Sequence, residues 1–143
     1  MTYRVGKPAE PLVCLVSSLA IALDRDTGRQ VWRYQASTRL VRIVYATERL
    51  FLLDADCVLH CLRVTDGGLL GKVQVDERSY WGCAMLPGPN DELYIATTNS
   101  IVALDATGRE MWRFKPDNVP SSHGSGLAGL ALPGAVMQPD MRE

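Results

Sequence analysis

The side chains of this 143-residue chain that could do chemistry are its four cysteines, its two histidines and a few closely spaced acids. The cysteines are Cys14, Cys57, Cys61 and Cys83. Their spacings of 43, 4 and 22 residues match no zinc or redox pattern, because those patterns begin with two cysteines about three positions apart. Each cysteine lies in an apolar run, and free cysteine is among the most buried residue types. We therefore interpret all four as reduced core residues.

His60 lies between Cys57 and Cys61, which raises the question of a thiolate and imidazole metal site. The run reads as a β-strand, and strand side chains alternate between the two faces. Cys57 and Cys61 are then predicted to share one face with Leu59. His60 is predicted on the other face, with Val58, so we predict no metal site here.

Two further groups of polar residues invite a chemical interpretation. Asp54 and Asp56 lie on one predicted hairpin, and calcium binds several oxygen ligands. Aspartate is also a common turn residue, so we predict a solvated turn. His123 lies among serines and glycines without a nucleophile elbow or an orienting acid, and we interpret that segment as a connection. No phosphate-binding loop, dinucleotide fingerprint or zinc-protease motif is present, so we predict no catalytic residues and no enzyme activity.

The composition is that of one ordinary domain, with 47% hydrophobic and 22% charged residues. A net charge of −1 with mixed signs gives no field that would attract nucleic acid or an anionic membrane. The chain opens without a basic region followed by an apolar run, so we expect a cytoplasmic protein, or one from which a signal has been removed. The apolar segment near the C-terminus is too short to span a bilayer.

The elements that must position these residues are revealed by an internal repeat. Residues 22–32 read ALDRDTGRQVW, and residues 103–112 read ALDATGREMW, one residue shorter. Each copy reads as a strand, a turn around glycine and a second strand that carries tryptophan. The equivalent leucines Leu23, Leu62 and Leu104 are 39 and 42 residues apart. This period is close to the roughly 40 to 45 residues of a four-stranded propeller blade.

Short runs of β-forming residues between turn signals give an all-β prediction: a β-propeller with about three antiparallel blades in one domain. The predicted parts are three strands of a first blade (12–35), a second blade (40–75), a third blade (80–115), a linker (116–124), a closing strand (125–134) and a tail (135–143). The closing strand is inferred because residues 125–134 resemble residues 79–88, the start of the third blade.

Three blades leave apolar blade faces and strand edges open, because propellers typically close with four to eight blades. Either partner chains complete the ring or the chain is part of a longer protein. We predict a homodimer or larger ring. In the dimer, two chains form six blades, and the C-terminal strand of each closes the first blade of the other. Closure of the first blade by the C-terminal strand of the same chain is the alternative.

Residues 22–32 fit the pattern A-x-D-x-x-T-G-[KR]-x-x-W, and this motif resembles the tryptophan-docking motif of the PQQ-like (quinoprotein alcohol dehydrogenase-like) propeller family. The resemblance implies that Ala22, Gly28 and Trp32 belong to a girdle in which each tryptophan packs on the neighbouring blade. The second copy supplies the same positions as Ala103, Gly108 and Trp112.

The middle unit departs from the motif. Cys61 stands for the alanine, Arg63 for the aspartate, Asp66 for the threonine and Gly71 for the tryptophan. A docking contact like that of the other two units is therefore not expected from the second blade.

The resemblance covers quinone-dependent dehydrogenases as well as non-catalytic scaffolds and sensor domains, and a fold by itself does not choose among them. The dehydrogenases combine an adjacent cysteine pair, a calcium ion and eight blades; this chain has no adjacent cysteines, so we do not expect pyrroloquinoline quinone (PQQ) with calcium. We predict a scaffold or protein-interaction module, with part of a quinone-dependent dehydrogenase or a small-molecule sensor as alternatives. Aromatic residues and arginines near the rims are the candidate contacts with an unknown protein partner: Arg39, Arg49, Tyr80 and Trp81.

Overall fold

The computed structural model describes residues 10–76, 84–97, 100–116, 130–133 and 135–137. Within these ranges the chain forms strands, turns and irregular segments, which confirms the all-β prediction. No helix of the described residues has the length and apolar character needed to cross a membrane.

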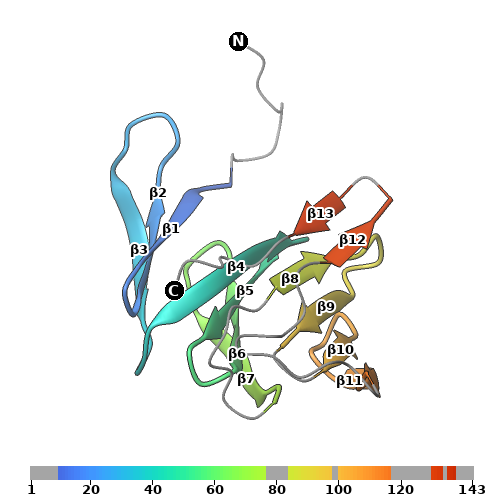
Figure 1. Cartoon of the computed structure of the whole chain (residues 1–143). Helices are drawn as coiled ribbons and strands as arrows, with labels where there is room; N and C mark the ends of the chain where they lie inside the picture. The colour runs from blue at the N-terminus through green and yellow to red at the C-terminus, as the bar shows by residue number, and fades with distance from the viewer. Residues whose placement is uncertain (1–9, 77–83, 98–99, 117–129, 134, 138–143) are drawn as a thin grey trace.

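The strands form three antiparallel sheets and a short hairpin (Figure 1). The first sheet contains β1 (Leu12–Val16), β2 (Leu19–Leu23) and β3 (Gln30–Gln35). The second sheet contains β4 (Leu40–Ala46), β5 (Arg49–Asp54), β6 (Val58–Arg63) and β7 (Leu69–Gln74). The third sheet contains β8 (Ala84–Pro87), β9 (Leu93–Ala96), β10 (Ile101–Leu104) and β11 (Glu110–Phe114). In each sheet the strands follow one another in chain order, so every sheet is a simple meander.

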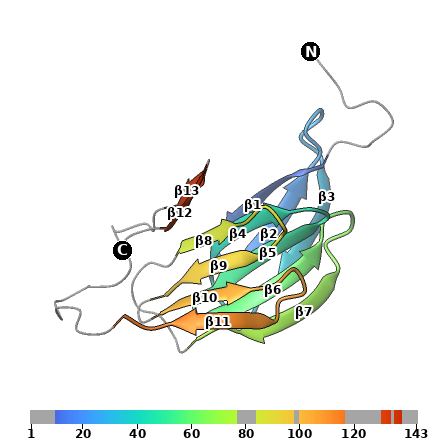
Figure 2. The same ribbon diagram turned by 90° about the vertical axis from the view of Figure 1, so that its right-hand side faces the viewer.

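The second sheet lies between the other two, with the first sheet on one face and the third on the opposite face (Figures 1 and 2). This position explains why β5 is buried on both faces. Leu50 and Leu52 point into the core shared with the first sheet. Phe51 and Leu53 point into the core shared with the third sheet. Because side chains alternate along a strand, β5 contributes residues to both cores.

The repeated segment has the same pairing pattern in all three sheets, although its turn is one residue shorter in the third. Its two strands are joined by a turn, and the pairing register shifts by one residue just before that turn. The tryptophan position therefore faces the alanine position across the ladder each time. The facing pairs are Ala22 with Trp32, Cys61 with Gly71, and Ala103 with Trp112. The alanine and tryptophan positions of the three units are therefore equivalent in the structure.

A glycine with positive φ closes each of these turns: Gly28 at 75°, Gly67 at 74° and Gly108 at 91°. In two turns an aspartate carboxylate accepts hydrogen bonds from the backbone that follows it. Asp24 accepts from the amides of residues 26 and 27, and Asp105 accepts from those of residues 107 and 109. In the second sheet, where arginine replaces this aspartate, Asp66 instead accepts from the amide of residue 68 at 2.8 Å.

The C-terminal strand differs from the prediction. The described part of segment 125–134 forms β12 (Leu130–Leu132), which pairs with β13 (Ala135–Met137) in a two-stranded hairpin. This hairpin lies next to β8 of the third sheet (Figure 1) and pairs with no strand of the first sheet among the described residues. Closure of the first sheet within the same chain is therefore wrong for the described strands, and the predicted tail contains a strand. The local turn at Pro133 lets β12 fold back on the residues that follow it.

Candidate functional site

Trp32 on β3 joins the first sheet to the second. Its side chain is buried, and its indole Nε1 donates a hydrogen bond to the backbone carbonyl of Val64 at 2.8 Å. The ring lies against Gly67, where an added Cβ would come within 2.5 Å of the Trp32 Cε3 atom. Two features thus require glycine at position 67: the positive φ of its backbone and the close approach of the Trp32 indole. The contact is a tryptophan of one sheet seated on the turn of the next.

Trp112 on β11 holds the same position in the third sheet, but its surroundings are different. It is 49% exposed, against 7% for Trp32. Its ring centroid lies 6.1 Å from that of Tyr94 on its own sheet. The packing of Trp112 on a neighbouring sheet, which the family resemblance implies, is therefore not made within the described chain.

The first sheet, at the other end of the three packed sheets, has an uncovered turn of the kind on which Trp32 packs. Gly28 in the first sheet corresponds to Gly67, yet it is exposed and has no atom within 4 Å of the position where a Cβ would stand. In the described chain, the Gly67 turn is therefore covered by a tryptophan, the Gly28 turn at the open end is not, and Trp112 has no such turn beneath it.

The junction between the second and third sheets is built differently, because Gly71 replaces the tryptophan. The carbonyl that corresponds to that of Val64 belongs to Ala106 in the aligned turn of the third sheet. It accepts a hydrogen bond from the guanidinium of Arg49, on β5. Arg49 thus provides the donor that an indole provides at the first junction.

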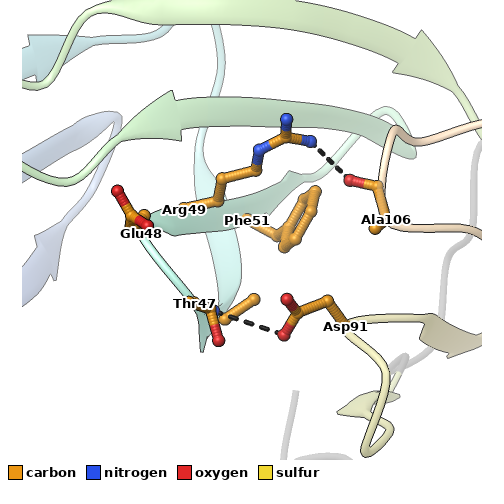
Figure 3. Close-up of a pocket in the computed structure, with 7 residues that line it drawn as sticks. Thr47, Glu48, Arg49, Phe51, Asp91 and Ala106 are labelled. Carbon is orange, nitrogen blue, oxygen red and sulfur yellow. Dashed lines mark hydrogen bonds between the residues drawn. The ribbon is translucent and has the colours of Figure 1, made fainter.

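A cavity of about 340 Å³ lies at this junction (Figure 3). Its walls come from the β4–β5 turn and the start of β5 in the second sheet and from two turns of the third sheet: Thr47, Glu48, Arg49, Phe51, Asp91 and Ala106. Asp91 has a positive φ of 63°, a conformation that aspartate tolerates, and its Oδ1 accepts a hydrogen bond from the Thr47 amide at 3.4 Å. The guanidinium of Arg49 and the carboxylate of Asp91 lie on opposite sides of the Phe51 ring (Figure 3).

A buried polar chain also links the first and second sheets. His60 Nε2 lies 2.8 Å from Asp54 Oδ2, and His60 Nδ1 lies 2.7 Å from the hydroxyl oxygen of Tyr34. Because the Asp54 carboxylate accepts, Nε2 is the donor to it, and in the neutral imidazole Nδ1 then accepts from the hydroxyl. Burial, with the charge of Asp54 as a smaller cause, raises the pKa of Tyr34, which keeps the phenol protonated. The series of acid, imidazole and hydroxyl has the same order as in a catalytic triad. Here, however, the Asp54 carboxylate and the His60 imidazole are both buried between the sheets.

This network corrects the interpretation of Asp54 as a solvated turn residue. Its carboxylate is buried, and its Oδ1 accepts from the amides of Asp56 and Val58 while Oδ2 contacts His60. The turn role is present, but packing of the first sheet on the second removes the side chain from water. No group of three or more His, Cys, Asp or Glu residues in the described ranges is arranged to hold a metal ion.

The remaining predicted residues are placed as follows. Cys14 and Cys61 are half-buried thiols, and burial raises the pKa of Cys61. Cys57 is buried and forms no disulfide, but it precedes β6 with a φ of 62° and so lies in the turn instead of on the strand face predicted for it. Arg39 is exposed just before β4, and Arg49 lines the cavity. Tyr80, Trp81, Cys83 and His123 lie outside the described residues.

Sequence reasoning missed three groups that the structure brings together. The Val64 carbonyl carries no sequence signal, since any residue has one. Tyr34 and His60 are 26 positions apart, and Arg49 and Ala106 are 57 apart. The alignment of the three units was the available signal, because it matches the carbonyls of Val64 and Ala106.

No protein-family model matches the sequence. No curated protein matches it either. Solved structures do share its arrangement of strands. BamB from Moraxella catarrhalis matches with a TM-score of 0.60 and 18% identity, over 72% of this chain and 34% of that chain. AztD from Citrobacter koseri matches with a TM-score of 0.67 and 15% identity, over 88% of this chain and 39% of that chain.

A europium-containing methanol dehydrogenase matches with a TM-score of 0.57 and 16% identity, over 74% of this chain and 24% of that chain. This chain thus spans well under half the length of each of these three proteins. At such identities the likeness shows the fold alone. The chain is a β-propeller of about three blades, and each of its three sheets is one blade.

Proposed function

We propose that this chain is a non-catalytic β-propeller module that assembles with a second copy of itself to complete a ring, whose rims bind a protein partner. The observation that carries the proposal is the contrast between buried Trp32 and half-exposed Trp112 at equivalent positions. An exposed indole in a motif that buries its other copy is an apolar surface suited to an interface.

Each end of the row of sheets presents an apolar face. On the third sheet, Trp112 and Phe114 share one side of β11 and are 49% and 54% exposed. On the first sheet, Leu12 and Val16 share one side of β1 and are 58% and 52% exposed. Leu12 pairs with Leu23 as Leu50 pairs with Leu62 in the second sheet, where both leucines are fully buried. The uncovered face of the first sheet is thus equivalent to the face of the second sheet on which the first sheet packs.

The proposed contact repeats the one inside the chain. Trp112 of one copy lies on the Gly28 turn of the other, and its indole donates to the carbonyl of Arg25, which corresponds to Val64. Two copies joined in this way at both ends give six blades, within the usual range for a closed propeller. This arrangement needs no C-terminal strand exchange, although exchange between copies is compatible with it.

Light scattering after size-exclusion chromatography tests the assembly. The full chain is expected at twice its 15.7 kDa mass, and Trp112→Ala is expected at the mass of one chain. Met111→Ala is the matched control, because Met111 is also 49% exposed but lies on the opposite side of β11. A parent chain that stays monomeric at all concentrations, or equal effects of the two variants, would contradict the proposal.

A mixing experiment tests which faces meet. Leu12→Lys places a charge on the open face of the first sheet and should also give monomers. A mixture of Leu12→Lys and Trp112→Ala chains retains one intact pair of faces per heterodimer, so association is expected to return in part. Monomers in every mixture, with both variants folded, would rule out contact between these two faces.

The quinone-dependent alternative has its own test. A non-catalytic module with no resident cofactor should show the same melting temperature with and without PQQ and calcium. A rise in melting temperature that saturates with quinone concentration would favour the dehydrogenase alternative.

A further inference from the structure

The cavity between the second and third sheets carries an inference that is independent of self-assembly. At about 340 Å³ it is at the lower end of the range of ligand pockets, which suits a small molecule. It lies at the junction where Gly71 replaces the docking tryptophan, and Gly71 has no atom within 4 Å of its Cβ position. At the first junction the indole of Trp32 fits against Gly67, whereas Gly71 contributes no side chain to the second.

A cation lies on one side of this cavity with most of its donors unused. The guanidinium of Arg49 has five N–H donors; among the described residues it donates one hydrogen bond, to the Ala106 carbonyl, and its charge also acts on the Cys61 thiol. No carboxylate of the described residues forms an ion pair with it. Arg49 is also half-buried, so its attraction for an anion is screened less than that of an exposed arginine. Arginine recognises carboxylates through two parallel hydrogen bonds.

An anion lies on the other side. The carboxylate of Asp91 uses one oxygen for a long bond to the Thr47 amide, and its left-handed backbone holds it at the cavity wall. Exposed Glu48 adds a second negative charge to the rim. Between the two charges lies the edge of the Phe51 ring (Figure 3), and Ala46 and Ala106 complete an apolar part of the wall.

Opposite charges that face one cavity without pairing with each other fit a ligand that carries both complementary charges. A simple anion would bind Arg49 but would meet the repulsion of Asp91 and Glu48. A simple cation would meet the repulsion of Arg49. We propose that this cavity binds a small α-amino acid in its zwitterionic form, with its carboxylate on Arg49, its ammonium group on Asp91 and an apolar side chain beside Phe51.

Three matched probes test the charge requirement: L-leucine, 4-methylpentanoate, which lacks the ammonium group, and 3-methylbutylamine, which lacks the carboxylate. Binding is followed by amide chemical shifts of Thr47, Asp91 and Ala106 in NMR spectra of the full chain. Leucine is expected to give saturable shifts, and each of the other probes is expected to bind roughly tenfold more weakly, as is typical for loss of one charged hydrogen-bond partner. Equal binding of 4-methylpentanoate, or no saturation by leucine up to about 10 mM, would overturn the proposal.

Two variants test the residues. Asp91→Asn retains the size of the side chain, and Arg49→Gln retains a donor for the Ala106 carbonyl. Each is expected to weaken leucine binding roughly tenfold. Arg33→Gln is the control, because Arg33 is an exposed arginine on β3 of the first sheet and does not line the cavity. Unchanged binding by folded Asp91→Asn, verified by its amide spectrum, would overturn the assignment even if Arg49→Gln fails to fold.

Discussion

Trp32 and Trp112 are two copies of one residue in one motif, and their environments set different consequences for their loss. Both pair with an alanine on the preceding strand. Trp32 is seated on the next sheet and satisfies the Val64 carbonyl, whereas Trp112 has half of its surface in water. The indole of Trp32 therefore contributes to the stability of the chain itself, and that of Trp112 contributes mainly when another surface covers it.

Trp32→Ala is expected to lower the free energy of unfolding by about 3 to 5 kcal/mol, as is typical of buried large-to-small changes. Urea denaturation of dilute protein measures this change. Trp112→Ala serves as the comparison and should cost clearly less under dilute conditions. Equal losses for the two variants would show that Trp112 is packed in the isolated chain after all.

The glycine beneath Trp32 gives a second prediction with an internal control. Gly67→Ala introduces a Cβ at 2.5 Å from the indole and an alanine at a φ of 74°, so both a clash and backbone strain result. Gly28→Ala introduces the same strain at a φ of 75° in open space. In dilute protein, where no second copy covers the Gly28 turn, we expect Gly28→Ala to cost about 1 to 2 kcal/mol and Gly67→Ala clearly more. Denaturant titration would contradict the seat if the two costs were the same.

At the scale of the elements, the β5–β6 hairpin is the central piece, because its strands lie in the sheet that has a neighbour on both faces. Leu50 and Leu62 reach the first core, and Phe51 and Leu59 reach the second. The same hairpin holds Asp54 and His60, whose network continues to Tyr34 of the first sheet. A fully bonded buried network of this kind fixes the register of one sheet on the next.

Tyr34→Phe tests that network. The variant retains the ring but removes the hydroxyl donor to His60 Nδ1, which leaves a buried nitrogen without that partner. The expected loss of stability is about 1 to 2 kcal/mol. Tyr94→Phe is the control: its hydroxyl donates to Glu92 at the surface, so the change should stay within about 0.5 kcal/mol. Equal stability of both variants in urea would mean that the network contributes nothing.

The turn between β10 and β11 predicts a pH dependence. Hydrogen bonds from the Thr107 hydroxyl, followed by amide bonds, lower the pKa of Asp105 from its ordinary 3.8 to about 2. The folded state therefore favours the ionised carboxylate, and the resulting stabilisation is complete above pH 4 or so and is lost as the pH falls toward about 2. Asp105→Asn should remove this part of the acid dependence. A carboxylate NMR titration with its midpoint at the ordinary value would contradict the turn geometry.

For the whole molecule, three blades with two open apolar ends predict that stability depends on concentration. Association that favours the folded chain raises the melting temperature with protein concentration, by mass action. The parent chain and Met111→Ala should both show this rise in calorimetry, and Trp112→Ala should show none. A melting temperature that is independent of concentration for the parent chain would argue against any assembly through these ends.

Much of the fold could be read from the sequence because the signals are local. Alternating β-forming residues mark the strands, the aspartate and glycine of each turn fix the hairpins, and the repeat fixes the common register. The prediction was weakest where contacts join distant segments. The burial of Asp54 depends on the first sheet, and β12 pairs with β13 instead of with the first sheet of its own chain.

The sequence by itself determined the all-β class, the three repeated units and the turn that each one contains, since these follow from side-chain alternation and from local hydrogen bonding. Only the tertiary structure decided that Trp32 is seated and Trp112 is not, and that Arg49 takes the place of an indole beside a cavity. The physical reason is that the burial of a side chain depends on whether another sheet packs against it. The tryptophan of the motif therefore lies in the core where a neighbouring sheet covers it and at the surface where none does.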